Sequence, residues 1–204
     1  MSPVSVRTSA VPPAGEPRQQ RERRARILDA TVALAAEGGF DAVQMRTVAE
    51  RAEVALGTLY RYFPSKVHLL VSALARDLTT AEELSRHQPP LGDSAGERVT
   101  ALLAATTARM QREPLLTEAL TRAFMFADAA ARDEIRSVSR LLVGMLVRAI
   151  RPDADPTSDD LAAAAVIRDV WLAALVGWVT GRTTAADVSR SLETAVRLLL
   201  DPAG

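Results

Sequence analysis

Residue types that carry much of protein chemistry are scarce in this sequence. Among 204 residues there is no cysteine, there are two histidines, His68 and His87, and Lys66 is the only lysine. Without cysteine the chain cannot form a disulfide, an iron–sulfur cluster or a thiolate nucleophile, and two histidines are too few for a multi-histidine metal site. A phosphate-binding P-loop needs a lysine between glycine and serine or threonine, whereas Lys66 lies between Ser65 and Val67. The sequence therefore predicts a protein with no metal ion and no cofactor.

Long hydrophobic runs are missing as well. Apolar stretches fall short of the roughly 18 residues that a membrane-spanning helix needs, and the longest one in the C-terminal half runs from Val170 to Val179. Residues 1–17 contain the tandem Pro12-Pro13 and no apolar block, which indicates a disordered tail rather than a secretory signal. These features predict a cytoplasmic protein with no membrane partner.

Helical periodicity dominates what is present. Hydrophobic residues make up 48% of the chain and charged residues 25%, which is ordinary for a globular protein, and no useful stretch alternates with the period of a strand. The fold class is therefore all-α. The expected helices cover residues 18–37, 45–52, 56–62, 66 to the loop at 89–93, 94–112, 114–126, 128–151, 158–181 and 185–200.

Charge is balanced overall and uneven along the chain. There are 25 basic and 25 acidic residues, and residues 1–66 hold 10 of the basic and 7 of the acidic ones. The N-terminal part is thus a small basic module attached to a slightly acidic helical body, a distribution typical of a protein that binds nucleic acid through one end.

Residues 45–62 have the pattern of a helix-turn-helix. Two short helices enclose a three-residue turn, with Ala49 small enough for close helix approach and Val54 filling the angle between the helices. The polar residues are left outward, and Gly57 at the start of the second helix allows its backbone to approach a phosphate. The candidate DNA-binding residues are Arg46, Thr47, Gly57, Thr58, Tyr60, Arg61, Tyr62 and Lys66.

The segment Gly57-Thr58-Leu59-Tyr60-Arg61-Tyr62-Phe63-Pro64-Ser65-Lys66 resembles the signature of TetR-type transcriptional repressors. This resemblance implies a helix-turn-helix DNA-binding domain over residues 18–66 and a C-terminal helical domain for ligand binding and dimerisation over 67–204. It also implies a homodimer, built mainly on the last two helices, that binds a palindromic operator. Two departures are Glu53, where many relatives have glycine, and Ala55, where they have a serine or threonine cap; both bear on local stability.

Further segments are similar to the KstR-type repressors of cholesterol degradation. They are residues 43–46, 110–119, 122–124, 126–128 and 169–172. This resemblance implies a repressor of steroid catabolism genes that is released from DNA by a large hydrophobic effector, a cholesterol-derived steroid acid or its coenzyme A thioester. A regulator of fatty-acid or multidrug-efflux genes, responding to an acyl-CoA or a hydrophobic drug, is the alternative.

The helix expected at 158–181 is apolar on two sides. We therefore expect one side to line a ligand pocket and the other to pack against a partner subunit. The candidate ligand-binding residues are Met110, Leu116, Phe124, Met145, Trp171 and Trp178, although large apolar residues more often belong to a core. No cluster of histidines, cysteines or inward acids that could recognise a metal ion or a polycation is expected, and Arg109, Arg112 and Arg122 are candidates for an anionic ligand end. The stripe Val188, Leu192, Val196 and Leu199 is expected to pack against a second subunit.

Two other classes of function explain less of the sequence. An enzyme is disfavoured because no Ser-His-Asp order, glycine-rich phosphate loop or HExxH motif is present. An adaptor that uses a basic helix to bind an acidic protein or a membrane surface would explain the arginines of residues 18–26 but not the segment 57–66.

Overall fold

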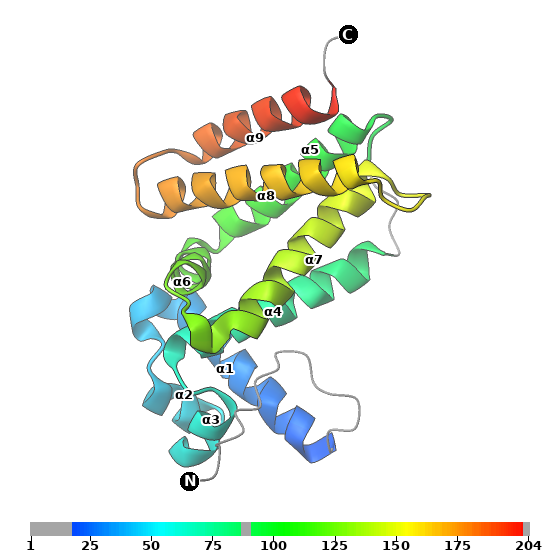
Figure 1. The fold of residues 1–204 in the computed structure, drawn as a ribbon. Coiled ribbons are helices and arrows are strands. Elements are labelled where there is room, and N and C mark those ends of the chain that lie inside the picture. The colour runs from blue at the N-terminus through cyan, green and yellow to red at the C-terminus, as the bar shows by residue number, and fades with distance from the viewer. Residues whose placement is uncertain (1–17, 87–90, 202–204) are drawn as a thin grey trace.

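The computed structural model describes residues 18–86 and 91–201, and in these ranges it contains helices and no strands. The residues expected to form a disordered tail, 1–17, lie outside the described part. α1, α2 and α3 form the base of the molecule in Figure 1, while α8 and α9 lie side by side at the opposite end. The helices are α1 (Arg18–Ala42), α2 (Met45–Arg51), α3 (Leu56–Tyr62), α4 (Lys66–Ser85), α5 (Ala95–Arg112), α6 (Pro114–Met125), α7 (Arg132–Ile150), α8 (Ser158–Val179) and α9 (Ala185–Leu200), with a 3-10 turn at Ala129–Ala131.

α1 is longer than predicted and is interrupted where the prediction ended it. Gly38 and Gly39 leave helical geometry, and Gly39 has φ 68°, a left-handed value that glycine adopts without strain. The buried face of the helix includes Ile27, Leu28 and Leu34. The last residues of α1, after the kink, pack against α6, so the end of the molecule that holds α1, α2 and α3 is joined to the body at this point.

α2 and α3 form the helix-turn-helix that the sequence predicts. The amide of Val54 donates to the carbonyl of Ala49 across 3.0 Å, which closes the turn between them. Glu53 in this turn has φ 53°, and Ala55 at the N-cap of α3 supplies no side-chain hydrogen bond. The two departures from the family pattern thus have the local effects that the sequence predicts. Glu53 is a non-glycine residue in the left-handed region, and Ala55 leaves the N-terminus of α3 without a side-chain cap.

α4 is a single helix that begins directly after the helix-turn-helix and crosses into the body (Figure 1). Ser65 caps it by accepting a hydrogen bond from the His68 amide across 3.1 Å. The helix packs against α1, α6 and α7, so one continuous element contacts both ends of the molecule.

Three capping boxes define the starts of helices in the body. They pair Ser94 with Glu97 at α5, Thr157 with Asp160 at α8, and Thr184 with Asp187 at α9. α7 begins at Arg132 rather than at the predicted 128, because the chain first makes the 3-10 turn.

The packing of α9 corrects one prediction. Val188, Leu192 and Val196, the stripe expected to meet a second subunit, are buried within this chain, where α9 packs on α5 and α8. Leu199 is the member of the stripe that remains exposed. Helical periodicity identified the apolar face correctly but could not say which neighbour covers it.

α8 is the one helix of the described residues that is long and apolar enough, by length and composition alone, to span a membrane, and 28% of its most apolar window is buried. The helix packs against α6, α7 and α9. Its exposed apolar side therefore lies on the surface of this helical body.

Candidate DNA interface and effector cavity

The helix-turn-helix presents a polar surface on its outer side. Tyr60 is 48% exposed and Arg61 is exposed as well, whereas Leu59 and Phe63 beneath them are fully buried. Arg46 is exposed at the start of α2 and pairs with Glu50 across 3.1 Å. The outward position predicted for Tyr60 is thus what the structure has.

The remaining candidates of this surface are half-buried or make contacts of their own. Thr47, Thr58 and Tyr62 are half-buried, and the guanidinium of Arg61 lies 5.9 Å from the centre of the Tyr62 ring. A Cβ placed on Gly57 would meet no atom within 4 Å, so the backbone here is open to an approaching phosphate.

Lys66 differs from a freely extended phosphate ligand. Its Nζ lies 3.9 Å from the centre of the Phe40 ring, and burial lowers the pKa of its ammonium group. Asp41 and Glu118 offset part of this shift, whereas Arg122 adds to it. The lysine thus joins the start of α4 to the end of α1 by a cation–π contact.

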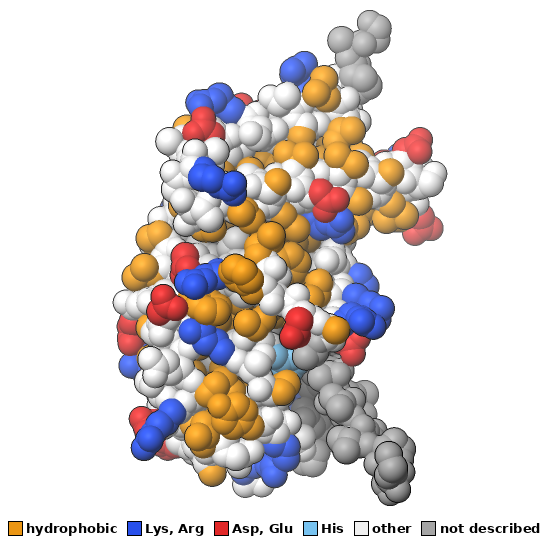
Figure 2. All heavy atoms as spheres, turned by 60° about the vertical axis from the view of Figure 1, so that its left-hand side comes forward, with side chains coloured by type: hydrophobic (Ala, Val, Ile, Leu, Met, Phe, Trp, Pro, Cys, Tyr) orange, Lys and Arg blue, Asp and Glu red, His pale blue; other side chains and the backbone are white. Residues whose placement is uncertain are grey.

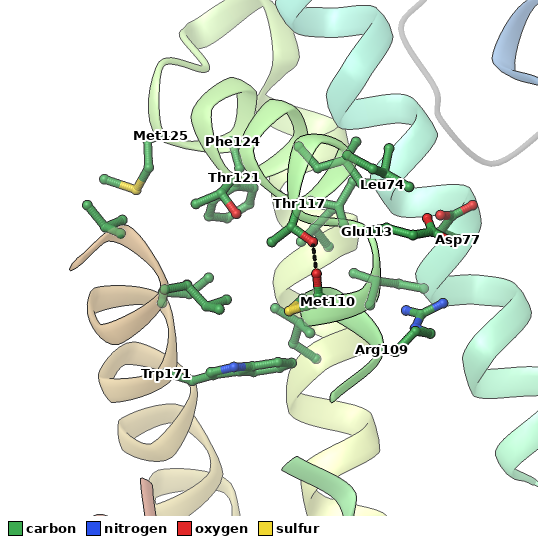
Figure 3. Close-up of a pocket in the computed structure, with 18 residues that line it drawn as sticks. Leu74, Asp77, Arg109, Met110, Glu113, Thr117, Thr121, Phe124, Met125 and Trp171 are labelled. Carbon is green, nitrogen blue, oxygen red and sulfur yellow. Dashed lines mark hydrogen bonds between the residues drawn. The ribbon is translucent and has the colours of Figure 1, made fainter. Parts of the chain in front are cut away.

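A cavity of about 120 Å³ lies between α4, α5, α6, α7 and α8. Four of the six predicted ligand-binding residues line it: Met110, Leu116, Phe124 and Trp171. Figure 3 shows Phe124, Thr121 and Thr117 pointing into it from α6, with the Trp171 ring reaching in from α8 below them. Thr117 donates to the carbonyl of Met110 across 2.9 Å, which ties α6 to the end of α5 beside the cavity.

Two acidic residues lie among the apolar lining of this cavity. Asp77 and Glu113 line the cavity, and burial raises the pKa of the Asp77 carboxyl, while Arg76 and Arg109 act against the shift. Of the arginines considered for an anionic ligand end, Arg109 lines the cavity; Arg112 and Arg122 do not. The polar edge formed by Asp77, Arg109 and Glu113 is visible in Figure 3, opposite Met125.

A second, larger cavity of about 750 Å³ lies beside the first, between α4, α5 and α7. Met145 lines this cavity only, and Trp178 lines neither of the two. The cavities share one wall, made of Asp77, Leu78, Arg109, Leu142 and Trp171. We name the smaller one the inner cavity and the larger one the outer cavity.

α6 connects the inner cavity to the DNA-binding end. One of its faces lines the cavity, and the other carries Glu118 and Arg122. Glu118 accepts a hydrogen bond from the Phe40 amide across 3.0 Å, and the guanidinium of Arg122 lies 4.4 Å from the Phe40 ring centre. Phe40 is therefore held between Arg122 of the body and Lys66 of α4.

A buried ion pair forms a second connection. His68 of α4 is 3% exposed and Glu134 of α7 is fully buried, and Nε2 of the histidine lies 3.0 Å from Oε1 of the carboxylate. Burial raises the pKa of Glu134, but the facing His68 ring, a backbone hydrogen bond and the charge of Arg24 together outweigh burial, so this pKa lies below its ordinary value. The histidine also packs on Phe63, with ring centres 5.9 Å apart, at the end of α3.

Several of these contacts were beyond sequence reasoning. Asp77 sits on the same helix as the predicted apolar stripe of α4, and nothing in its spacing shows that it turns inward. Phe40 and Glu118 are 78 residues apart, so only the folded chain brings them together. The sequence offered one hint of this contact, the Gly38-Gly39 pair. A left-handed glycine at this point changes the direction of the chain just before Phe40.

Comparison with known proteins places this arrangement in a family. The model of bacterial regulatory proteins of the tetR family matches residues 27–73, and the tetracyclin repressor-like C-terminal domain matches residues 92–199. The chain belongs to the TetR family of helix-turn-helix transcriptional repressors, which are DNA-binding regulators and not enzymes.

Within that family the chain is similar to KstR repressors. It is 59% identical over 181 residues to the HTH-type transcriptional repressor KstR of Rhodococcus jostii, covering 89% of this chain and 84% of that protein. It is 52% identical, also over 181 residues, to KstR of Mycobacterium tuberculosis, covering 89% and 82% of the two chains. The resemblance predicted from residues 43–46, 110–119, 122–124, 126–128 and 169–172 is confirmed.

Solved structures show the same fold. A TetR regulator from Rhodococcus sp. RHA1 matches with a TM-score of 0.78 and 31% identity, covering 92% of this chain and all of that one. The FadR repressor of Thermus thermophilus, solved with lauroyl-CoA, matches with a TM-score of 0.67 and 22% identity, covering 86% and 92%.

Proposed function

We propose that this repressor acts as a homodimer on a palindromic operator and leaves it when a cholesterol-derived steroid acid, or its coenzyme A thioester, binds the body of the protein. The observation that carries the proposal is an apolar cavity lined from α4, α6, α7 and α8 in a chain 52–59% identical to KstR repressors. The proposed setting is the cytoplasm, where the operator is accessible.

The size of the inner cavity supports a mechanism for release. Sites for drug-sized ligands occupy roughly 300 to 1,000 Å³, whereas the inner cavity measures about 120 Å³. A steroid would therefore have to displace the walls, and α6 is the wall whose opposite face holds Phe40 through Glu118 and Arg122. Binding would shift the contacts that orient the helix-turn-helix and favour a state whose recognition helices no longer fit successive grooves.

On the DNA side, we propose that Thr58 and Arg61 reach base edges in the major groove and that Arg46, Thr47, Gly57, Tyr60, Tyr62 and Lys66 position the protein on the backbone. The support is the exposure of Tyr60 and Arg61 on the outer side of α3 and the open space at Gly57. One such unit reads too few bases for useful specificity, so a two-fold pair is expected.

The DNA assignment is tested by gel shift with the operator and with unrelated duplexes. Arg61→Ala should reduce the preference for the operator by about 1 to 3 kcal/mol and leave binding to unrelated duplexes nearly unchanged. Arg132→Ala, at an exposed position at the start of α7, is the control. If the Arg61→Ala protein keeps the full preference for the operator, Arg61 does not contact base edges.

The effector assignment is tested by adding ligands to the protein–operator complex. Steroid acids and their coenzyme A thioesters should release the DNA at lower concentrations than lauroyl-CoA or long-chain acyl-CoA. Release by the fatty-acyl compounds alone would favour the alternative, a regulator of fatty-acid genes, which the coenzyme A ester bound to the Thermus thermophilus FadR structure brings into consideration.

A further inference from the structure

Trp171 occupies a special place in the effector region. Its ring forms part of the wall that the inner and outer cavities share, and the side chain is only 4% exposed (Figure 3). The indole carries a single polar group, an N–H that donates and cannot accept. This N–H is therefore the one polar group that α8 contributes to the shared wall.

The indole N–H has no hydrogen-bond partner within the described part of the chain. The nearby carbonyl of Met110 already accepts from Thr117 across 2.9 Å and from the Glu113 amide across 3.3 Å. Ser72 and Thr107, whose buried hydroxyl groups also have no partner within the described residues, line neither cavity. A buried donor left unpaired costs free energy, which an acceptor atom arriving with a ligand would recover.

We propose that Trp171 is a specificity residue that donates a hydrogen bond from its indole N–H to a carbonyl oxygen of the effector, at the point where the ligand passes from the inner to the outer cavity. This inference rests on the proposed function, because it assumes a hydrophobic effector in this region. It adds a chemical requirement: the effector carries an acceptor oxygen at that point, and a pure hydrocarbon of the same shape is rejected.

The composition of the wall supports a neutral acceptor there. Besides Trp171, the shared wall has two apolar side chains, Leu78 and Leu142, and one charged side chain of each sign, Asp77 and Arg109. A ketone or thioester carbonyl satisfies the indole without bringing a charge into an apolar setting, whereas an ammonium group would leave the donor unpaired.

The chain allows a direct spectroscopic test, because it has two tryptophans and hence two indole N–H signals in a ¹H–¹⁵N spectrum. Trp171→Phe and Trp178→Phe assign them, and Trp178 serves as the internal control because it lines neither cavity. The probes are cholest-4-en-3-one and cholest-4-ene, delivered in cyclodextrin, which differ in a single carbonyl oxygen. The ketone should move the Trp171 signal downfield, and the hydrocarbon should not.

Affinity provides the second measurement. The wild-type protein should bind the ketone about tenfold more tightly than the hydrocarbon, as expected for one hydrogen bond to a buried donor, and Trp171→Phe should abolish this difference while Trp178→Phe retains it. A benzothienylalanine at position 171 keeps the ring size without the donor and should behave as Trp171→Phe does, which separates the hydrogen bond from any loss of packing. A ketone that binds without moving the Trp171 signal, or a preference that survives both replacements, would overturn the proposal.

Lauroyl-CoA separates this inference from the steroid assignment. If it binds and shifts the Trp171 signal while neither these steroids nor the steroid acids and their coenzyme A thioesters bind, the steroid proposal falls and the role of Trp171 stands, since a thioester also carries a carbonyl oxygen. If none of the three probes binds the wild-type protein, both proposals fall.

Discussion

Breaking a buried polar contact on one side is expensive, because the remaining group is left without a partner, and His68 and Glu134 illustrate this at the scale of single residues. Both side chains are removed from water at the meeting point of α4 and α7. Water solvates neither of them, so each depends on the other and on the surrounding dipoles. The pair fixes the position of α4 on α7, and His68 in turn packs against Phe63 at the end of α3.

Removing one partner should therefore cost more than removing both. We expect Glu134→Leu to lower the free energy of unfolding by about 3 kcal/mol, because His68 is left buried without a partner, and the double variant with His68→Leu to be closer to the wild type. Urea unfolding of the two single variants and the double variant measures this. Losses that simply add would show that the two side chains do not depend on each other.

Individual residues were predictable where local geometry alone decides their position. Tyr60 follows Leu59 on a short helix, so its outward direction comes from helical spacing. Lys66 was expected to extend toward a phosphate, and the sequence could not show that the α1 kink brings Phe40 against its ammonium group. Contacts between distant segments depend on the angle between helices, which periodicity does not contain.

At the scale of the element, α3 combines weak helix signals with an open surface. It has no side-chain cap, and Gly57 lies in its first turn, although glycine is a poor helix residue. A methyl group at this position would enter open space. Gly57 thus makes α3 less stable, at the position where the proposed phosphate contact requires a backbone without a side chain.

Gly57→Ala should separate stability from DNA binding. We expect it to raise the free energy of unfolding by about 0.5 to 1 kcal/mol and to weaken binding to all duplexes, because the added methyl group keeps the backbone away from the phosphate. Gly144→Ala in α7 is the matched control, since its Cβ would meet only Glu82 at 3.8 Å, and it should affect stability alone. Thermal unfolding and gel shifts give the two readouts; undiminished DNA binding by Gly57→Ala would contradict the proposed backbone contact.

Helix positions and types were largely predictable, whereas helix partners were not. The bounds of α3 match the expectation, and α6 and α9 differ from it by at most one residue, because proline, glycine and capping residues mark them. The stripe of Val188, Leu192 and Val196 was assigned to a second subunit and is instead covered by this chain. An apolar face requires a cover, and only the tertiary structure determines whether it comes from the same chain.

At the scale of the whole molecule, part of the exposed apolar surface lies on α8. Figure 2 shows hydrophobic side chains over the upper part of the molecule, where α8 and α9 lie, and others in its middle and lower parts. Leu161 and Val166 of α8 and Leu198 and Leu199 of α9 are exposed. Exposed apolar surface of this kind is typical of protein–protein interfaces. α8, rather than the buried stripe of α9, is therefore the proposed centre of the dimer.

A charge on this surface should prevent dimer formation without unfolding the chain. Val166 is 48% exposed on α8, so Val166→Glu costs little in the isolated subunit but would bury an unpaired carboxylate in the proposed interface. We expect light scattering at micromolar concentration to find a monomer with an unchanged helical circular-dichroism spectrum, and operator affinity to fall because one subunit reads only half of the site. Leu91→Glu, in the exposed loop before α5, is the control and should remain dimeric. A Val166→Glu protein that stays dimeric and keeps its operator affinity would place the subunit interface elsewhere.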